Sequence, residues 1–316
     1  ADFINASSGQ NYWSRRYNGR ISDILSGRTE NAREVAHQVG FSILKSSIEL
    51  SRSRPLPQVE SHALFMAAIN DIHRHRLANF SNARRQLEHL VERVPDHSVL
   101  YAWLAKWYVL AISQGWSDSA AVDTRLALDH TQRALDIDPA CAVSLTVDGM
   151  IRSSSPAEQS LADKRFQEAL AIDPNHALAW LMYARMYAYR GDGGKAVEYA
   201  QRATFLSPLD PHGYFFDALL AMCHVVDGNL QRGYDLISRS LSANPNHVST
   251  HRAKVITLQM MGRDAEANAA AKHLLRRDPT LTVENYIESH PAGDSAIGQD
   301  WGAALKAAGI PQRSIR

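Results

Sequence analysis

The 316-residue sequence has only two cysteines, Cys141 and Cys223, and no apolar run near the roughly 20 residues that a membrane-spanning helix needs. Two isolated cysteines argue against a disulfide framework and favour a reducing compartment, so we expect a cytoplasmic protein. The formal net charge is +1, which gives no global field toward polyanions. We therefore expect neither direct nucleic-acid binding nor membrane association.

Catalytic motifs are also missing from the sequence. It has no glycine-rich phosphate loop, no HExxH, no CxxC and no GxSxG. We therefore predict no enzyme activity, no catalytic residues and no cofactor. Four histidines recur just after corner prolines, at His97, His176, His212 and His247. Stacked helices place equivalent positions about 10 Å apart, whereas metal ligands lie about 2 Å from the ion, so no metal site is expected.

What the sequence does contain is a repeated proline. Prolines that close a helical segment fall at Pro95, Pro139, Pro174, Pro208, Pro245 and Pro279, at intervals of 44, 35, 34, 37 and 34 residues. Four of them sit in related phrases, ALDIDPACA, LAIDPNHAL, LSANPNHVS and LRRDPTLTV. Because the residue before a proline is pushed out of the helical region, each phrase predicts the end of one helix.

Small residues keep one register relative to these prolines. The residue twelve positions before each proline is Ala83, Ala127, Ala162, Ala196, Gly233 or Ala267. Glycines also lie in three of the expected turns, at Gly191, Gly228 and Gly262. A helical hairpin repeated about every 34 residues resembles the tetratricopeptide repeat, over residues 61–286. This resemblance implies an all-α, right-handed superhelix of about six hairpins, best represented by WLMYARMYAYRGDGGKAVEYAQRATFLSP at 180–208.

The first interval, of 44 residues, contains about ten additional residues within 110–125, including Trp116. Long insertions in repeat proteins emerge on one face and often carry binding function. The alternative is an extended turn in which Trp116 folds onto its own repeat.

The resemblance to tetratricopeptide proteins also implies a binding face, because their first helices line a concave groove. Transferred by position, this groove presents apolar residues with sparse cations, which suits an apolar or amphipathic segment with a carboxylate. We therefore expect a protein or peptide segment, or a small effector, as the partner. The candidate groove residues are Phe65, His75, Arg76, Lys106, Leu181, Arg185, Tyr189, Phe215, Met222 and Arg252.

Different patterns flank the repeats. Residues 1–19 predict a β-hairpin, residues 21–50 a helix, and residues 51–57 (SRSRPLP) a linker. At the other end, WGAALKAA at 301–308 predicts an amphipathic helix that caps the last repeat. We thus divide the chain into residues 1–57 (hairpin plus helix), 58–286 (repeat solenoid) and 287–316 (loop and capping helix).

The flanks resemble those of bacterial multidomain regulators. SSGQNYWSRRYNGRISDI at the start and WGAALKAAGIPQ at the end are similar to segments of class III adenylate or guanylate cyclases, and of winged-helix transcriptional activators with a TolB-like α/β domain before the repeats. This resemblance implies that residues 1–57 are the remnant of, or linker from, such a domain. Three hypotheses follow: a regulatory module that controls an upstream output domain, part of a cyclase whose catalytic domain lies elsewhere, or a homodimerising scaffold.

Overall fold

The computed structural model describes residues 2–4, 11–14, 56–74, 76–208, 210 and 212–313. The chain divides into two compact units, residues 1–66 with 207–211 and residues 67–206 with 212–316. In the first unit, strands β1 (Asp2–Ile4) and β2 (Asn11–Ser14) pair antiparallel, with Phe3 opposite Trp13. The predicted hairpin is thereby confirmed. The helix predicted at 21–50 lies outside the described residues.

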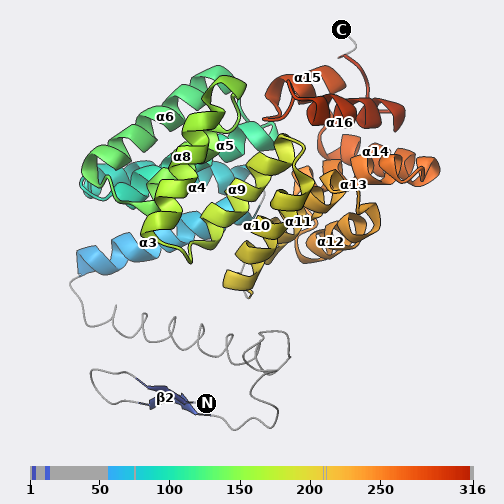
Figure 1. The fold of residues 1–316 in the computed structure, drawn as a ribbon. Coiled ribbons are helices and arrows are strands. Elements are labelled where there is room, and N and C mark those ends of the chain that lie inside the picture. Colours follow the sequence, from blue (N-terminus) through green and yellow to red (C-terminus); the bar gives the residue numbers. More distant parts are fainter. Residues whose placement is uncertain are drawn as a thin grey trace. The chain divides into compact units, whose positions relative to one another are not determined.

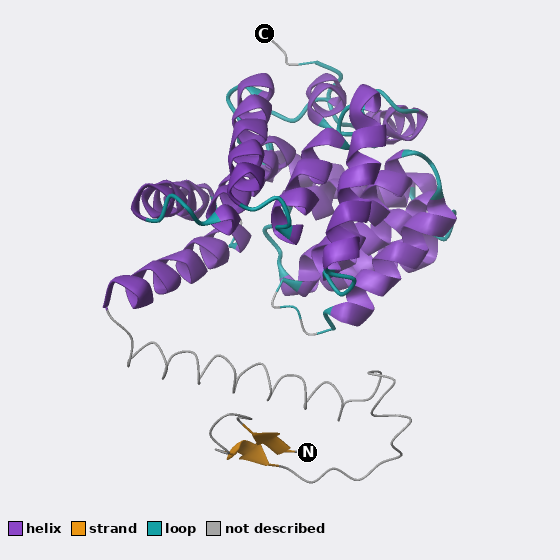
Figure 2. Cartoon of the chain, turned by 60° about the vertical axis from the view of Figure 1, so that its left-hand side comes forward, coloured by secondary structure: helices purple, strands orange, loops and turns teal. Residues whose placement is uncertain are grey.

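Apart from this strand pair, the described elements are helical (Figure 2). Twelve helices form six consecutive hairpins: α3 (Leu56–His73) with α4 (Leu77–Arg93), α5 (Ser98–Gln114) with α6 (Ala120–Ile137), α7 (Ala142–Arg152) with α8 (Gln159–Ile172), α9 (Ala177–Tyr189) with α10 (Gly193–Leu206), α11 (Gly213–Val226) with α12 (Leu230–Ala243), and α13 (Val248–Met260) with α14 (Asp264–Arg277). A short 3₁₀ turn, η1 (Pro156–Glu158), precedes α8. Figure 1 shows the labelled helices in order along the chain.

The predicted packing positions explain why the hairpins close. The five alanines of the small-residue register are fully buried, and Gly233 is buried as well. A Cβ added at Gly233 would lie 2.7 Å from Cγ2 of Val225 on the facing helix. Gly191 and Gly228, in the turns, have φ angles of 80° and 81°, a backbone region that side chains other than glycine rarely adopt. The repeat register read from the prolines is therefore confirmed.

The first hairpin begins earlier than the pattern indicated. The sequence predicted a linker at residues 51–57 with the repeats after it, but α3 starts at Leu56. Pro57 falls in the first turn, where a missing N–H removes no helical hydrogen bond. The first six residues of α3 are therefore compatible with the helix despite the proline.

The extra residues of the second repeat lengthen both of its helices. α5 has 17 residues and α6 has 18, against 13 or 14 in each helix of the fourth, fifth and sixth hairpins. Trp116 does not project from the surface: its ring lies 4.9 Å from that of Phe80 in the preceding repeat, between ring centroids. The insertion thus extends both helices, and Trp116, in the turn between them, packs against a neighbouring repeat.

The carboxyl-terminal end is covered by two further helices, α15 (Val283–Ser289) and α16 (Ala296–Ala307). Trp301 and Leu305 of α16 are buried in one apolar cluster with residues of α13 and α14. The predicted capping helix is therefore confirmed, although it begins at Ala296, five residues before Trp301.

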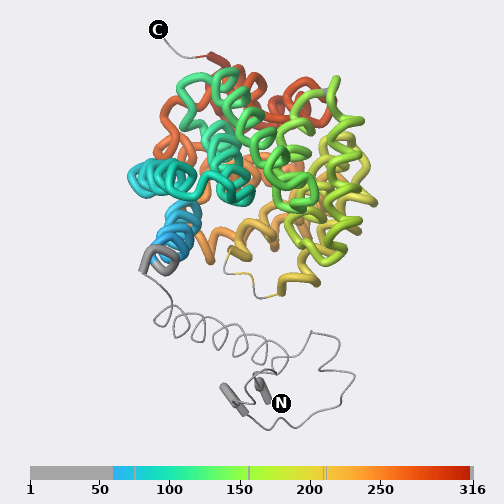
Figure 3. The backbone as a smooth tube through the Cα atoms, turned by 90° about the vertical axis from the view of Figure 1, so that its left-hand side faces the viewer, coloured from blue at the N-terminus to red at the C-terminus, as the bar shows by residue number. Residues whose placement is uncertain are grey.

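The second unit curves back on itself, so that hairpins distant in sequence meet. His73, at the end of α3, accepts or donates a 2.8 Å hydrogen bond between its Nδ1 and the hydroxyl of Tyr214 in α11. The His73 and His212 rings stack with centroids 3.6 Å apart. Helices α5 and α13 are likewise in contact. In Figure 3 the orange and red part of the tube accordingly returns beside the blue and teal part.

Candidate ligand-binding cavity

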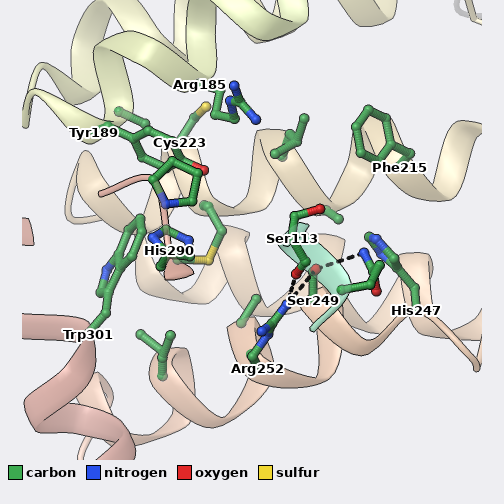
Figure 4. A pocket seen from close by; sticks show the side chains of 18 of the residues that line it. Ser113, Arg185, Tyr189, Phe215, Cys223, His247, Ser249, Arg252, His290 and Trp301 are labelled. Carbon is green, nitrogen blue, oxygen red and sulfur yellow. Dashed lines mark hydrogen bonds between the residues drawn. The ribbon is translucent and has the colours of Figure 1, made fainter. Parts of the chain in front are cut away.

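The inner face of the second unit holds a partly open cavity of about 110 Å³. Its walls come from α5, α7, α9, α11 and α13, together with α15, α16 and the segment between them (Figure 4). The residues that line it include Ser113, Gln114, Arg185, Tyr189, Phe215, Met222, Ser249, Arg252, Ile256, Tyr286, His290 and Trp301. Five hairpins and the capping segment thus meet around one partly open space.

Two hydrogen-bond contacts join the second hairpin to the sixth at the edge of this cavity. The side-chain amide of Gln114 donates to the Ser249 hydroxyl at 3.1 Å, and Nη2 of Arg252 donates to the Ser113 carbonyl. Ser113 and Gln114 belong to the last turn of α5, within the inserted residues. The insertion therefore carries α5 far enough to reach α13, and we call these two contacts the α5–α13 closure.

Arg185 presents a buried guanidinium to the cavity. Its side chain on α9 is 7% exposed, and its Nη2 donates to the Met150 carbonyl at 2.9 Å and to the Ser153 hydroxyl at 3.1 Å. Its Nε is buried and has no hydrogen-bond partner among the described residues. Desolvation by burial lowers the pKa of Arg185, which shows that the surroundings do not fully stabilise its charge.

Arg252 is the second buried guanidinium. It is 7% exposed, and its Nη2 donates to the Ser249 hydroxyl at 3.0 Å as well as to the Ser113 carbonyl. Burial lowers the pKa of Arg252 also, as the dominant effect. Among the described residues neither Arg185 nor Arg252 forms an ion pair, and no carboxylate lines the cavity. The cavity is consequently electropositive.

Both arginines are held by the ends of helices. Met150 lies in the last turn of α7 and Ser113 in the last turn of α5. Carbonyl groups at a helix carboxyl terminus lack partners within the helix and carry a partial negative charge. The partial negative charge of a helix terminus therefore offsets part, but not all, of the positive charge of each guanidinium.

His290 adds a neutral donor. Its Nδ1 accepts a 3.1 Å hydrogen bond from the Ala292 N–H, so the proton of the neutral ring resides on Nε2. Burial, reinforced by the positive charges of Arg252 and Arg185, lowers the pKa of His290 to about 3. The imidazole is thus uncharged at neutral pH and donates from Nε2.

Aromatic and apolar side chains complete the walls. The ring of Tyr189 lies 5.4 Å from that of His290 and 6.2 Å from that of Trp301, between centroids. Phe215 and Met222, both on α11, are partly buried and line the same cavity. The site therefore combines concentrated positive charge with a mostly apolar surface.

Five of the ten predicted groove residues meet here: Arg185, Tyr189, Phe215, Met222 and Arg252. The others do not line the cavity. Leu181 is fully buried and Lys106, 5% exposed, lies with its Nζ 4.1 Å from the ring centroid of Trp103. Phe65 is partly buried and Arg76 is exposed just before α4, while His75 lies outside the described residues.

Several residues that line the cavity were not among the ten predicted groove residues. Tyr286 and His290 follow the last repeat, and Trp301 was assigned only a capping role. Ser113 and Gln114 lie in the insertion, where its unusual length was the available signal. Position within a first helix therefore placed five of the ten predicted residues correctly, whereas most of the lining was not predicted.

A second cavity of about 250 Å³ adjoins the first and shares Ser113, Arg185 and His290 with it. Its lining also contains three acidic residues, Glu158, Glu288 and Asp294. The second cavity is therefore lined by acidic side chains as well as by Arg185, whereas the first has no lining carboxylate.

Comparison with known proteins identifies the fold. No family model matches the sequence. Among solved structures the chain is similar to the Cut9–Hcn1 hetero-tetramer of APC/C, with a TM-score of 0.52 and 14% identity over 79% of this chain and 46% of that one. It is also similar to PilW, a type IV pilus biogenesis factor (TM-score 0.49, 21% identity, 66% of this chain and 92% of that one), and to TTC0263, a thermophilic TPR protein of Thermus thermophilus (0.48, 15%, 63% and 98%).

The fold is a tetratricopeptide superhelix. At these identities the likeness concerns the fold alone. Among the described residues, no helix combines the length and apolar character that crossing a bilayer requires, and no three His, Cys, Asp or Glu side chains are placed to hold a metal ion.

Proposed function

We propose that this chain is a non-catalytic interaction module whose inner cavity binds a small effector and whose α5–α13 closure transmits the bound state to a protein partner. The observation that carries this proposal is the meeting of five hairpins around two buried, incompletely compensated arginines. A ligand there contacts helices far apart in sequence, so its binding energy acts directly on the closure.

The dimensions of the cavity favour a small effector over a peptide on the inner face. A volume of about 110 Å³ lies below the range of roughly 300–1,000 Å³ typical of pockets for drug-sized ligands. A helical peptide, about 10 Å in diameter, is too wide for a cavity of this volume. We therefore place the protein partner on the outer surface, and the effector inside.

The likeness in fold to a protein of the Cut9–Hcn1 assembly supports a protein partner. We further propose that the partner of this chain is an output domain for transcription or cyclic-nucleotide signalling, as the flanking segments suggest. The buried free thiols of Cys141 and Cys223 are compatible with a cytoplasmic location.

The test compares partner capture by the intact chain and by a closure variant. In cells, proximity labelling from the wild-type chain, from Gln114→Ala/Ser249→Ala and from the exposed-surface control Arg202→Gln should enrich one partner with the wild type and the control. The closure variant should change its enrichment severalfold. Equal enrichment with all three folded chains would contradict the regulatory coupling, and no reproducible partner would contradict the interaction module itself.

A further inference from the structure

We propose that the inner cavity is a binding site for a small organic monocarboxylate, with the carboxylate between Arg185 and Arg252 and the apolar body against Phe215, Met222 and Ile256. In Figure 4, Arg185 lies on the α9 side of the pocket and Arg252 on the α13 side. This inference rests on the proposed function and adds the chemical class of the effector.

The charge of the cavity selects a monoanion. Each arginine brings one positive charge, and the helix terminus that it contacts offsets about half a unit charge. Within this cavity, whose lining has no carboxylate, Arg185 at the end of α7 and Arg252 at the end of α5 therefore leave about one positive charge uncompensated. The nearest carboxylates, such as Asp278 for Arg252 and those of the adjoining cavity for Arg185, lie outside this lining. One carboxylate restores neutrality, whereas a phosphate dianion would leave an excess negative charge in a poorly solvated site.

Most of the unpartnered hydrogen-bonding groups of the cavity are donors, and one is an acceptor, the buried Oε1 of Gln114, which has no partner among the described residues. The buried Nε of Arg185 has no partner among the described residues. Nε2 of His290 carries the proton, because Nδ1 accepts from Ala292. Burial raises the pKa of Tyr286, so its phenol keeps a proton to donate. Carboxylate oxygens accept several such bonds at once, and charge-assisted hydrogen bonds are the strong ones.

The remaining walls fit a short apolar body. Phe215, Met222, Ile256 and Trp301 contribute aromatic and aliphatic surface. For scale, an apolar cavity of about 150 Å³ in another protein binds benzene. A cavity of about 110 Å³ therefore suits an acid with a short aliphatic chain or a single ring, and excludes larger bodies unless the closure opens.

The experiment titrates the full chain by calorimetry with butyrate, hexanoate and benzoate, and with butyramide, hexanamide and benzamide as neutral counterparts. We expect at least one acid to bind in the closed cavity at least tenfold more tightly than its own amide. This comparison uses the wild-type protein only, so it does not depend on the folding of any variant. The proposal is overturned if no acid binds at 10 mM (roughly the weak end of specific binding), or if acids and amides bind alike.

Two further probes separate other anion sources. Inorganic phosphate should compete with the bound acid at least tenfold more weakly than a second carboxylate does. A five-residue peptide ending in a free phenylalanine carboxylate should not displace the acid, because the closure blocks its entry. Tighter binding of phosphate or of the peptide would replace the monocarboxylate proposal with one for that ligand.

Variants then assign the site. Arg185→Gln and Arg252→Gln should each weaken the acid at least tenfold, since each removes a charge-assisted contact. The exposed Arg202→Gln on α10 is the matched control and should bind as the wild type does. Unchanged binding in folded Arg185→Gln or Arg252→Gln would place the acid elsewhere and overturn the assignment.

The failures of the two proposals are distinguishable. If acids bind in the cavity but occupancy leaves partner enrichment unchanged, the ligand class stands and the regulatory function fails. If the closure variant alters partner enrichment while no acid binds, the regulatory function stands and the monocarboxylate proposal fails.

Discussion

Arg185 is buried and Arg165 is partly buried, but only Arg165 is paired with a carboxylate. Arg165 donates from Nε to Asp148 at 3.0 Å, and Asp148 also accepts from Arg152 at 2.8 Å and from Thr131 at 3.2 Å. Arg185 donates hydrogen bonds only to a carbonyl and a hydroxyl, and its guanidinium carbon lies 5.5 Å from the ring centroid of Tyr189. An arginine whose charge is paired with a carboxylate stabilises the fold. An arginine at a cavity whose charge has no such partner is available to bind a ligand.

This difference predicts opposite effects of removing the charge. Arg185→Met should leave the free energy of unfolding unchanged or raise it by about 1–2 kcal/mol, because an apolar side chain of similar size avoids the desolvation cost. Arg165→Met should lower it by about 1–3 kcal/mol, since the buried Asp148 loses a partner. Urea denaturation measures both, and a loss above about 1 kcal/mol in Arg185→Met would show that the arginine is structural.

Gly233 lies where α12 closely approaches α11, so a substitution there tests this packing. A Cβ at this position would lie 2.7 Å from Cγ2 of Val225 and 3.0 Å from the Ala221 carbonyl. Gly233→Ala should therefore cost about 1–3 kcal/mol of unfolding free energy, as overpacking does. Gly194→Ala in α10 is the matched control, because nothing lies within 4 Å of its added Cβ, and it should gain about 0.5–1 kcal/mol. Equal effects in the two variants would contradict this packing.

His290 predicts a pH dependence of stability. Its pKa is about 3 in the folded chain and about 6.5 in the unfolded chain. Between these values the unfolded state binds the extra proton, so stability is fully present above about pH 6.5 and is lost as pH falls toward 3. His290→Phe should reduce the slope of unfolding free energy against pH by up to about 1.4 kcal/mol per pH unit, whereas the exposed His89→Phe should not. An unchanged slope in a folded His290→Phe protein would refute the burial of a neutral ring.

At the scale of elements, the sequence sufficed for the repeat and not for the site. The corner prolines and the alanines are local signals, since each acts within its own hairpin, and they located all six hairpins. The cavity depends instead on how far successive hairpins rotate, which is set by many small contacts between repeats. Ser113, Gln114, Tyr286 and His290 therefore reach the cavity through closure of the chain, which no periodic pattern encodes.

The capping helix α16 gives an element-scale prediction. Leu305 is fully buried and lies in the apolar cluster that joins α16 to the last repeat. Leu305→Ala should cost about 2–5 kcal/mol of unfolding free energy, the usual range for such a cavity-creating change. The neighbouring Lys306 is exposed, so Lys306→Ala should stay within about 0.5 kcal/mol of the wild type. Thermal denaturation followed by circular dichroism compares the two, and similar midpoints would mean that α16 does not protect the core.

In the second unit, contacts between hairpins that are distant in sequence create an inner cavity, which an open solenoid lacks. Hairpins of an open solenoid contact only their neighbours, so disturbances remain local. Here Gln114 and Arg252 connect α5 with α13 across more than 130 residues of sequence. These hydrogen bonds couple the position of α5 to that of α13. Such coupling between distant elements is the physical requirement for a module that transmits a bound state.

The strength of this coupling is measurable by hydrogen exchange. Arg252→Ala removes the guanidinium that contacts the last turn of α5, a charged hydrogen bond worth about 1.5–3 kcal/mol. Exchange of the amides at 110–115 should accelerate about tenfold to a hundredfold, although the substitution lies on α13. The exposed Arg202→Ala on α10 should leave these amides as they are. If Arg252→Ala accelerates exchange only within α13 itself, then α5 is held by its own repeat, and the closure does not connect the two sides of the cavity.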